Sequence, residues 1–162
     1  MKKLTNCLLG KKKTCFPVWF MRQAGRYLPE FRKIRSQNPD FIKLCLNDKL
    51  SSTITLQPLK RFNLDAAIIF SDILMVPYGL GQKVSFIKDK GPILSKLNIN
   101  NFIKMNERDF VKKIKPVYSA IKKTRNKLNK NNSLISFVGA PWTLAVYMLG
   151  LKKDKNVLDL KK

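Results

Sequence analysis

The sequence lacks histidine entirely, and this absence excludes several kinds of chemistry for its 162 residues. A chain without His has no His general base, no Ser-His pair and no His-ligated metal. Acidic residues are also scarce: 10 Asp and Glu stand against 33 Lys and Arg, which gives a net charge of +23. With 44% apolar residues, however, the chain can build a core, so a disordered basic tail is excluded.

Cysteine pairs and long apolar segments are missing as well. The three cysteines, Cys7, Cys15 and Cys45, are an odd number without CxxC spacing, which indicates ordinary thiols of a reducing compartment. The apolar stretch after Lys2 is broken by Asn6 and the lysines at 11–13, so no secretory signal is predicted. The run 137–151 is too short to span a bilayer. We expect a soluble, cytoplasmic protein.

The positive charge is carried mostly by lysine, which supplies 26 of the 33 basic residues. A net charge of +23 by itself suggests nucleic acid or an anionic membrane as a partner. The lysines fall mainly in helical stretches such as 111–130, however, and this distribution favours solvated helix faces. We therefore expect no nucleic-acid or membrane partner, and a basic binding protein remains the alternative from another functional class.

Start signals and apolar spacing predict an α/β chain. Helices are expected over 31–36, from Phe41 to Cys45, from Asp48 to about Lys60, from Glu107 to Leu128 with an interruption near Pro116, and from about Pro141 to Leu149. Buried strands are expected over Asp65–Phe70 and Leu134–Val138, and an exposed strand over Lys83–Ile87 after a turn-rich stretch at 77–82. In such folds the functional residues lie at the carboxyl ends of the parallel strands.

Arginine is concentrated in one short part of the chain. Four of the seven arginines, Arg22, Arg26, Arg32 and Arg35, lie between positions 22 and 35. Because a guanidinium binds carboxylate or phosphate through two hydrogen bonds, which an ammonium cannot do, this cluster predicts an anion site. The alternative is that some of these arginines pair with acidic neighbours, Glu30 or Asp40.

Asp72 is the candidate carboxylate, since it directly follows the apolar strand that ends at Phe70. It is predicted to lie at a pocket floor, and the alternative is an N-cap of the following turn. Asp72 has no Cys or second carboxylate at metal-ligand spacing, so no metal site is predicted. Tyr147 could direct its hydroxyl toward the same pocket, although tyrosines in apolar helices usually belong to the core. The residues thus predict an α/β domain that binds an anion beside a lone carboxylate.

Several blocks of the sequence resemble the uroporphyrinogen decarboxylase family. PVWFMRQAGRYLPEFR at 17–32 is similar to its N-terminal signature, LQPLKRF at 56–62 and LDAAIIFSDIL at 64–74 to its next block, and FVGAPWTL at 137–144 to its second signature. The resemblance implies a (β/α)8 TIM-type barrel, which needs roughly 250 residues. Residues 1–162 are accordingly expected to be the N-terminal portion of one barrel domain. The family's later active-site Ser and His have no counterpart, so we expect this chain to be inactive alone.

The resemblance also implies a reaction and roles for the residues singled out above. The family removes CO₂ from the four acetate side chains of uroporphyrinogen III to give coproporphyrinogen III, without metal or organic cofactor, as a homodimer. Arg22, Arg26 and Arg35 match its carboxylate-binding arginines, the backbone at Gln23, Ala24 and Gly25 lines the same wall, and Tyr147 matches a substrate-contacting tyrosine. Asp72 matches the central carboxylate that accepts hydrogen bonds from the pyrrole N–H groups, and Asp72 and Arg22 are the catalytic candidates.

The alternative within the same fold is a cobalamin- or thiol-linked methyltransferase. Those enzymes use a zinc site of His and Cys and lack the RQAGR segment found at 22–26 here. The decarboxylase is therefore the favoured interpretation.

Overall fold

The computed structural model describes residues 2–11, 16–87 and 91–151. The chain forms two compact units: the first comprises Met1–Asp72 and Ile114–Phe137, the second Ile73–Lys113 and Val138–Lys162. Of the cysteines predicted to be ordinary thiols, Cys7 is exposed, Cys45 is buried and both are free. Cys15 lies outside the described residues.

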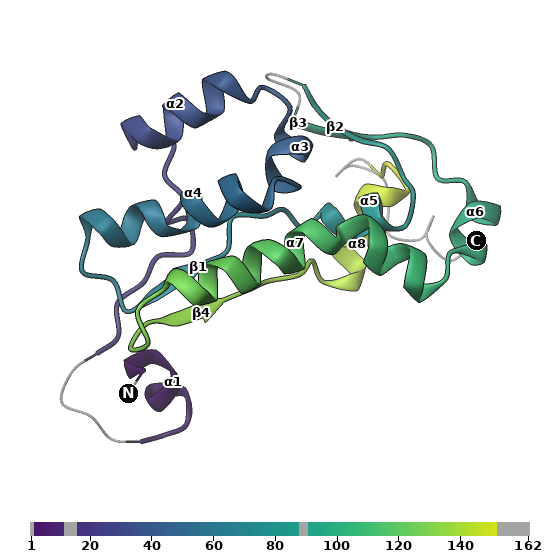
Figure 1. Ribbon diagram of the computed structural model, residues 1–162. Helices are drawn as coiled ribbons and strands as arrows, with labels where there is room; N and C mark the ends of the chain where they lie inside the picture. Colours follow the sequence, from purple (N-terminus) through teal and green to yellow (C-terminus); the bar gives the residue numbers. More distant parts are fainter. Residues whose placement is uncertain (1, 12–15, 88–90, 152–162) are drawn as a thin grey trace. The chain divides into compact units, whose positions relative to one another are not determined.

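Two short parallel strands form the centre of the first unit (Figure 1). β1 (Ala66–Ile68) and β4 (Ser133–Ile135) pair with Ala66 opposite Ser133 and Ile68 opposite Ile135. The parallel direction is consistent with the connection between them, which runs through helices rather than through a tight turn. Both predicted strands are confirmed, but each is shorter than its apolar run, and the predicted burial of the second is wrong: Leu134 and Ile135 of β4 are half-buried, and Phe137 and Val138 beyond it are exposed.

Four helices of the first unit precede β1 in the chain: α1 (Lys3–Leu8), α2 (Pro29–Gln37), α3 (Phe41–Cys45) and α4 (Asp48–Arg61). The last three helices were predicted: α3 and α4 begin where expected, whereas α2 begins at Pro29, two residues before the predicted range 31–36. Side chains explain the starts of α3 and α4. Asp40 accepts a hydrogen bond from the Lys43 N–H, and Asn47 accepts one from the Leu50 N–H, each at 3.0 Å. These are N-caps, which satisfy backbone donors that the helix itself leaves free.

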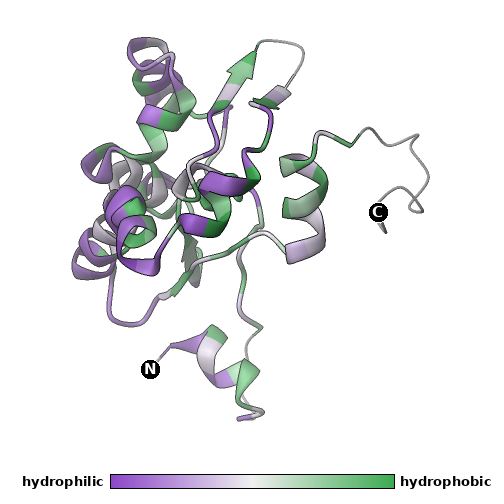
Figure 2. Ribbon diagram, turned by 90° about the vertical axis from the view of Figure 1, so that its right-hand side faces the viewer, coloured by the Kyte–Doolittle hydropathy of each residue, from purple (hydrophilic) through white to green (hydrophobic). Residues whose placement is uncertain are grey.

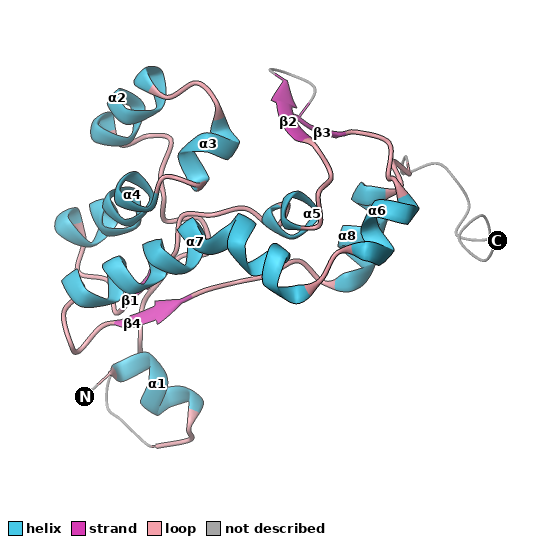
Figure 3. Ribbon diagram, turned by 45° about the vertical axis from the view of Figure 1, so that its right-hand side comes forward, coloured by secondary structure: helices cyan, strands magenta, loops and turns pink. Residues whose placement is uncertain are grey.

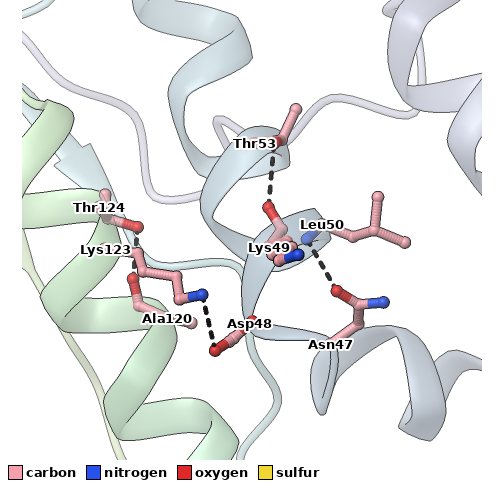
Figure 4. A network of polar contacts seen from close by, with 8 residues as sticks. All are labelled: Asn47, Asp48, Lys49, Leu50, Thr53, Ala120, Lys123 and Thr124. Carbon is pink, nitrogen blue, oxygen red and sulfur yellow. Dashed lines mark hydrogen bonds and ion pairs between the residues drawn. The ribbon is translucent and has the colours of Figure 1, made fainter.

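Helix α7 (Glu107–Lys127) is continuous, and the predicted interruption near Pro116 is wrong. A proline removes a single backbone donor, and the bonds on both sides of it maintain a helix of 21 residues. Within the first unit, the Lys123 ammonium forms an ion pair with Asp48 at 3.1 Å, which joins α7 to the start of α4 (Figure 4). On α7 itself, the Thr124 hydroxyl donates to the Ala120 carbonyl at 2.7 Å (Figure 4).

The second unit contains a β-hairpin and three short helices (Figure 3). β2 (Val84–Ile87) pairs antiparallel with β3 (Gly91–Leu94), and the helices are α5 (Met75–Gly79), α6 (Ile99–Lys104) and α8 (Pro141–Met148). The strand predicted over 83–87 and the helix predicted from 141 are confirmed. The structure corrects the turn-rich prediction for 77–82, because α5 occupies part of that range; β3 and α6 were not predicted.

Buried Gln82 connects two parts of the second unit. Its Nε2 donates to the Ser95 carbonyl at 2.6 Å and to the Met148 carbonyl at 2.9 Å, which ties the end of the hairpin to α8. Helix α8 leads to the grey C-terminal trace in Figure 2 and is drawn mostly in green and white, as expected for its apolar sequence. None of the helices in the described part of the chain is both long and apolar enough to cross a membrane.

Candidate functional site

The segment that carries Arg22 and Arg26 has no regular structure, and hydrogen bonds to the start of β1 hold it. Val18 and Asp65 exchange two bonds of 2.8 Å: the Val18 N–H donates to the Asp65 carboxylate, and the Asp65 N–H donates to the Val18 carbonyl. Lys3 forms an ion pair with the same carboxylate at 3.0 Å. Burial alone would raise the pKa of Asp65, but the Val18 N–H and the Lys3 ammonium outweigh burial and lower it.

Gln23 provides a second, buried attachment of this segment. Its side chain lies inside the unit with 3% exposure; Oε1 accepts from the Phe20 N–H at 2.8 Å, and Nε2 donates to the Ala66 carbonyl at 3.0 Å. Both ends of the amide are therefore used to join the segment to β1. Gly25, two residues later, accepts at its carbonyl from the Leu28 N–H at 3.0 Å and so closes the turn that leads into α2.

Arg22 and Arg26 are exposed, and neither forms a hydrogen bond or ion pair with any other residue that the structure describes. Arg22 borders a cleft of about 520 Å³ in the first unit, whose other walls are largely apolar: Phe20, Met21, Gln23, Tyr27, Pro58, Phe62 and Leu64. A guanidinium without an internal carboxylate partner keeps its donors available for an external anion.

Arg32 does not pair with either acidic neighbour, so that alternative is wrong for this residue. Glu30 is engaged by Arg61 through two hydrogen bonds of 2.7 and 2.9 Å, and this arginine lowers the pKa of the Glu30 carboxyl. Asp40 caps α3 and lies 3.7 Å from the Lys43 ammonium. The two nearby carboxylates are thus bound by other groups, and Arg32 is exposed on α2.

Arg35 is the most firmly oriented of the clustered arginines. Its Nη1 donates to the Asn38 carbonyl at 2.6 Å, and its guanidinium carbon lies 5.8 Å from the centre of the Phe41 ring. A cation over an aromatic face is attracted by the ring quadrupole. The edge-on contact of Phe41 with Phe70, at 5.8 Å between ring centres, continues this packing to the end of β1.

Cys45 shows that Asp72 and Arg35 belong to one neighbourhood. Burial raises the pKa of the Cys45 thiol, the negative charge of Asp72 raises it further, and the positive charge of Arg35 lowers it. Both charges therefore act at the same buried sulfur in the first unit. Two of the residues predicted for the site, Asp72 and Arg35, thus both influence the charge state of the Cys45 thiol.

The remaining predicted residues are not brought to this neighbourhood by any contact described above. Arg22 and Arg26 stand on the segment held by Gln23, whereas Tyr147 lies on α8 of the second unit with 38% of its surface exposed. A shared site that includes Tyr147 stays a prediction. Within the described residues, no group of three or more His, Cys, Asp and Glu side chains is arranged to hold a metal ion.

Several side-chain contacts that support the site were not predicted from the sequence. The Ser51 and Thr55 side chains bind the backbone at the end of β1, Phe41 stacks with Arg35, and the Gln23 side chain fastens the arginine segment. The only local signal is that Ser51 and Thr55 are four residues apart, which places both hydroxyls on one face of α4.

Comparison with known proteins agrees with the sequence blocks. The uroporphyrinogen decarboxylase family model matches residues 1–162. The uroporphyrinogen decarboxylase of Agrobacterium fabrum is 45% identical over 91% of this chain, and the match covers 43% of that protein. The uroporphyrinogen decarboxylase of Campylobacter hominis is 47% identical over 94% of this chain, and the match covers 46% of that protein. That of Rickettsia canadensis is 44% identical over the whole chain and is covered to 48%. The chain thus spans less than half the length of these relatives.

A solved structure is similar in fold. The methyltransferase from Methanosarcina mazei matches 92% of this chain with a TM-score of 0.70, and the match covers 44% of that protein. Its sequence identity is 16%, so the likeness shows the fold alone.

Proposed function

The chain belongs to the uroporphyrinogen decarboxylase family, and we propose that the full-length protein containing it decarboxylates the four acetate side chains of uroporphyrinogen III to give coproporphyrinogen III. In this proposal residues 1–162 are the N-terminal portion of a (β/α)8 barrel domain, which acts in the cytoplasm as a homodimer without cofactor. The parallel strands β1 and β4 and the likeness in fold to a methyltransferase structure support the architecture.

The observation that carries the proposal is the unpaired state of Arg22 and Arg26. Arg61 and Lys3 form ion pairs with Glu30 and Asp65, but the guanidinium groups of Arg22 and Arg26 contact no carboxylate within the described residues. Their segment is nevertheless fastened by the buried Gln23 amide, so the cations are held on a fixed backbone. Fixed, unpaired guanidinium groups suit a substrate that carries several carboxylates.

Asp72 supplies the opposite charge at the end of β1. In the proposed reaction a pyrrole carbon next to the acetate arm is protonated, and positive charge spreads over the ring. The Asp72 carboxylate accepts hydrogen bonds from the pyrrole N–H groups and stabilises that charge. The bond between the acetate methylene and its carboxylate carbon then breaks, CO₂ leaves, and the electron pair neutralises the ring as an exocyclic methylene. Protonation of that methylene carbon and loss of the proton first added to the ring give the methyl group of the product. Arg22, Arg26, Arg35 and Tyr147 bind and orient the substrate in this scheme.

The test is turnover of uroporphyrinogen III by the full-length protein. We expect stepwise loss of four CO₂, which is measured by mass spectrometry of the oxidised porphyrins. The double substitution Arg22→Ala and Arg26→Ala should abolish turnover at the same substrate concentration. Arg108→Ala, which removes an exposed arginine from α7, is the matched control and should leave turnover unchanged. A wild-type protein that releases no CO₂ from this substrate would refute the proposal.

A further inference from the structure

Two hydroxyl groups of α4 bind the backbone at the point where the β1–β4 sheet stops. The last bond between the two strand segments runs from the Ile69 N–H to the Ile135 carbonyl at 3.0 Å. At the next residue, the Phe70 N–H donates to Thr55 Oγ1 at 2.8 Å, and the Phe70 carbonyl accepts from Ser51 Oγ at 2.6 Å. Side chains thus replace the neighbouring strand for both polar groups of Phe70.

The direction of each hydroxyl proton is determined by these partners. A carbonyl can only accept, so Ser51 must donate to Phe70; an N–H can only donate, so Thr55 must accept from it. The Thr55 proton is then free to bind the Ser51 carbonyl, which lies 2.8 Å away. Together the bonds form a closed ring through Phe70, Thr55 and Ser51, with every donor and acceptor assigned.

The sequence of α4 explains why both hydroxyls reach the same peptide. Ser51 and Thr55 are one helical turn apart, and their residues are 0% and 1% exposed. The adjacent Ser52 is also 0% exposed, yet its hydroxyl has no hydrogen-bond partner among the residues that the structure describes. Burial of a hydroxyl in this helix therefore does not by itself produce the contact with Phe70.

The bound residue links directly to the candidate site. The Phe70 ring makes edge contacts with Phe31 and Phe41, at 6.0 and 5.8 Å between ring centres, and Phe41 lies beneath Arg35. Asp72 is two residues further along the chain. Because its backbone and its ring are both held, Phe70 restricts where the chain can place Asp72, two residues later.

We propose that Ser51 and Thr55 are positioning residues of the decarboxylase: their hydroxyls hold the Phe70 backbone and thereby set the place of Asp72. This inference rests on the proposed function. A carboxylate stabilises a developing cation only when it stays at the right position, and a displacement of about 1 Å can cost as much as a hundredfold in rate.

The first test is kinetic and uses the full-length protein. Thr55→Val keeps the side-chain shape and removes both bonds of its hydroxyl, so we expect kcat to fall about tenfold while KM changes less than threefold. Thr55→Ser restores the hydroxyl and should recover most of the turnover. Ser51→Ala removes a single bond and should have a smaller effect on kcat in the same direction.

Matched controls come from hydroxyls that do not touch Phe70. Ser52→Ala removes an equally buried but unbonded hydroxyl, and Thr124→Val removes a fully buried threonine hydroxyl whose bond stays within α7. Both should leave kcat unchanged. If the controls lower kcat as much as Thr55→Val does, the effect is one of general stability, and the inference is wrong.

A double-mutant cycle separates positioning from stability. If Thr55 acts through Asp72, then Thr55→Val should have little further effect on kcat once Asp72→Asn is present. Independent, multiplying effects would overturn the inference. If Thr55→Val does not fold, the same cycle is measured with Ser51→Ala in its place.

Hydrogen exchange provides a readout that does not depend on activity. Thr55→Val should accelerate amide exchange at Phe70 at least about tenfold relative to Thr124→Val, because the N–H loses its acceptor. Wild-type protein that is inactive on uroporphyrinogen would refute the proposed function, and the exchange result would still decide whether the hydroxyls hold Phe70. Unchanged exchange at Phe70 overturns the further inference whatever the activity.

Discussion

The arginine segment and the end of β1 carry opposite charges, and the first unit holds them in different ways. The segment at 17–28 is attached through Gln23 and Asp65, while the side chains of Arg22 and Arg26 remain exposed and unpaired. At the end of β1, the backbone and the ring of Phe70 are both bound before the chain reaches Asp72. The cations are thus exposed on a fastened backbone, whereas the residue that precedes the anion by two positions is bound through both its backbone and its ring.

The largest effect on turnover is expected at Asp72, which follows the end of β1. Asp72→Asn in the full-length protein keeps the size of the side chain but removes its charge. We expect kcat to fall roughly a hundredfold, on the order of 3 kcal/mol, with a much smaller rise in KM. Asp40→Asn is the control, because asparagine caps a helix as well as aspartate does. Near-normal turnover by Asp72→Asn would reduce Asp72 to a structural residue.

The next effect concerns the connection between the two regions. Gln23→Ala removes the bonds to the Phe20 N–H and the Ala66 carbonyl and leaves both groups without their partner. We expect a loss of about 2 kcal/mol in the free energy of unfolding, measured by urea titration. Gln57→Ala is the comparison, since Gln57 is also buried but its Oε1 has no hydrogen-bond partner in the described part of the chain. Equal losses for the two variants would show that the Gln23 bonds add nothing beyond packing.

A moderate effect is expected on the arginine side. Arg26→Lys retains the positive charge and loses the planar pair of donors, so substrate should bind about tenfold more weakly, with KM affected more than kcat. The same substitution at the exposed Arg108 should change neither constant. Wild-type affinity in Arg26→Lys would mean that charge alone matters at this position.

The smallest effect is expected at Asp65 and depends on pH. Because its folded-state pKa lies below the ordinary value of 3.8, the carboxylate stabilises the fold above that pH, and the contribution is lost as pH falls through the lower folded value. Asp65→Asn should therefore cost about 1 kcal/mol of unfolding free energy near pH 7 and progressively less below pH 4. Lys3→Met should reproduce part of the loss. A difference that persists unchanged in acid would contradict this assignment.

Local signals explain which elements could be predicted. The starts of α2, α3 and α4 follow from Pro29, Asp40 and Asn47, since N-terminal proline and capping side chains act within one turn of the helix. Continuous apolar runs likewise indicated β1 and β4. The interruption predicted at Pro116 was wrong because the rest of α7 provides enough bonds to tolerate the missing donor.

Elements that depend on distant partners could not be predicted in this way. The helical turn of α5 and the strand β3 have weak local patterns, and β3 exists as a strand through its pairing with β2. The hydrogen bonds that support the site join residues even further apart in the sequence. The bonds from α4 to Phe70 join residues 15 and 19 positions apart, and the Gln23 bond to Ala66 joins residues 43 apart.

The sequence by itself determined the chemistry available to this protein: no histidine, few carboxylates, a cluster of arginines and a single aspartate after a buried strand. These are properties of residue type and order, so they do not depend on folding. Only the tertiary structure decided which of these groups are paired and which are held. Glu30 pairs with Arg61 rather than with Arg32, and the hydroxyls of Ser51 and Thr55 form hydrogen bonds with the Phe70 backbone. Hydrogen bonds act over about 3 Å, and only the folded chain brings such distant residues within that range.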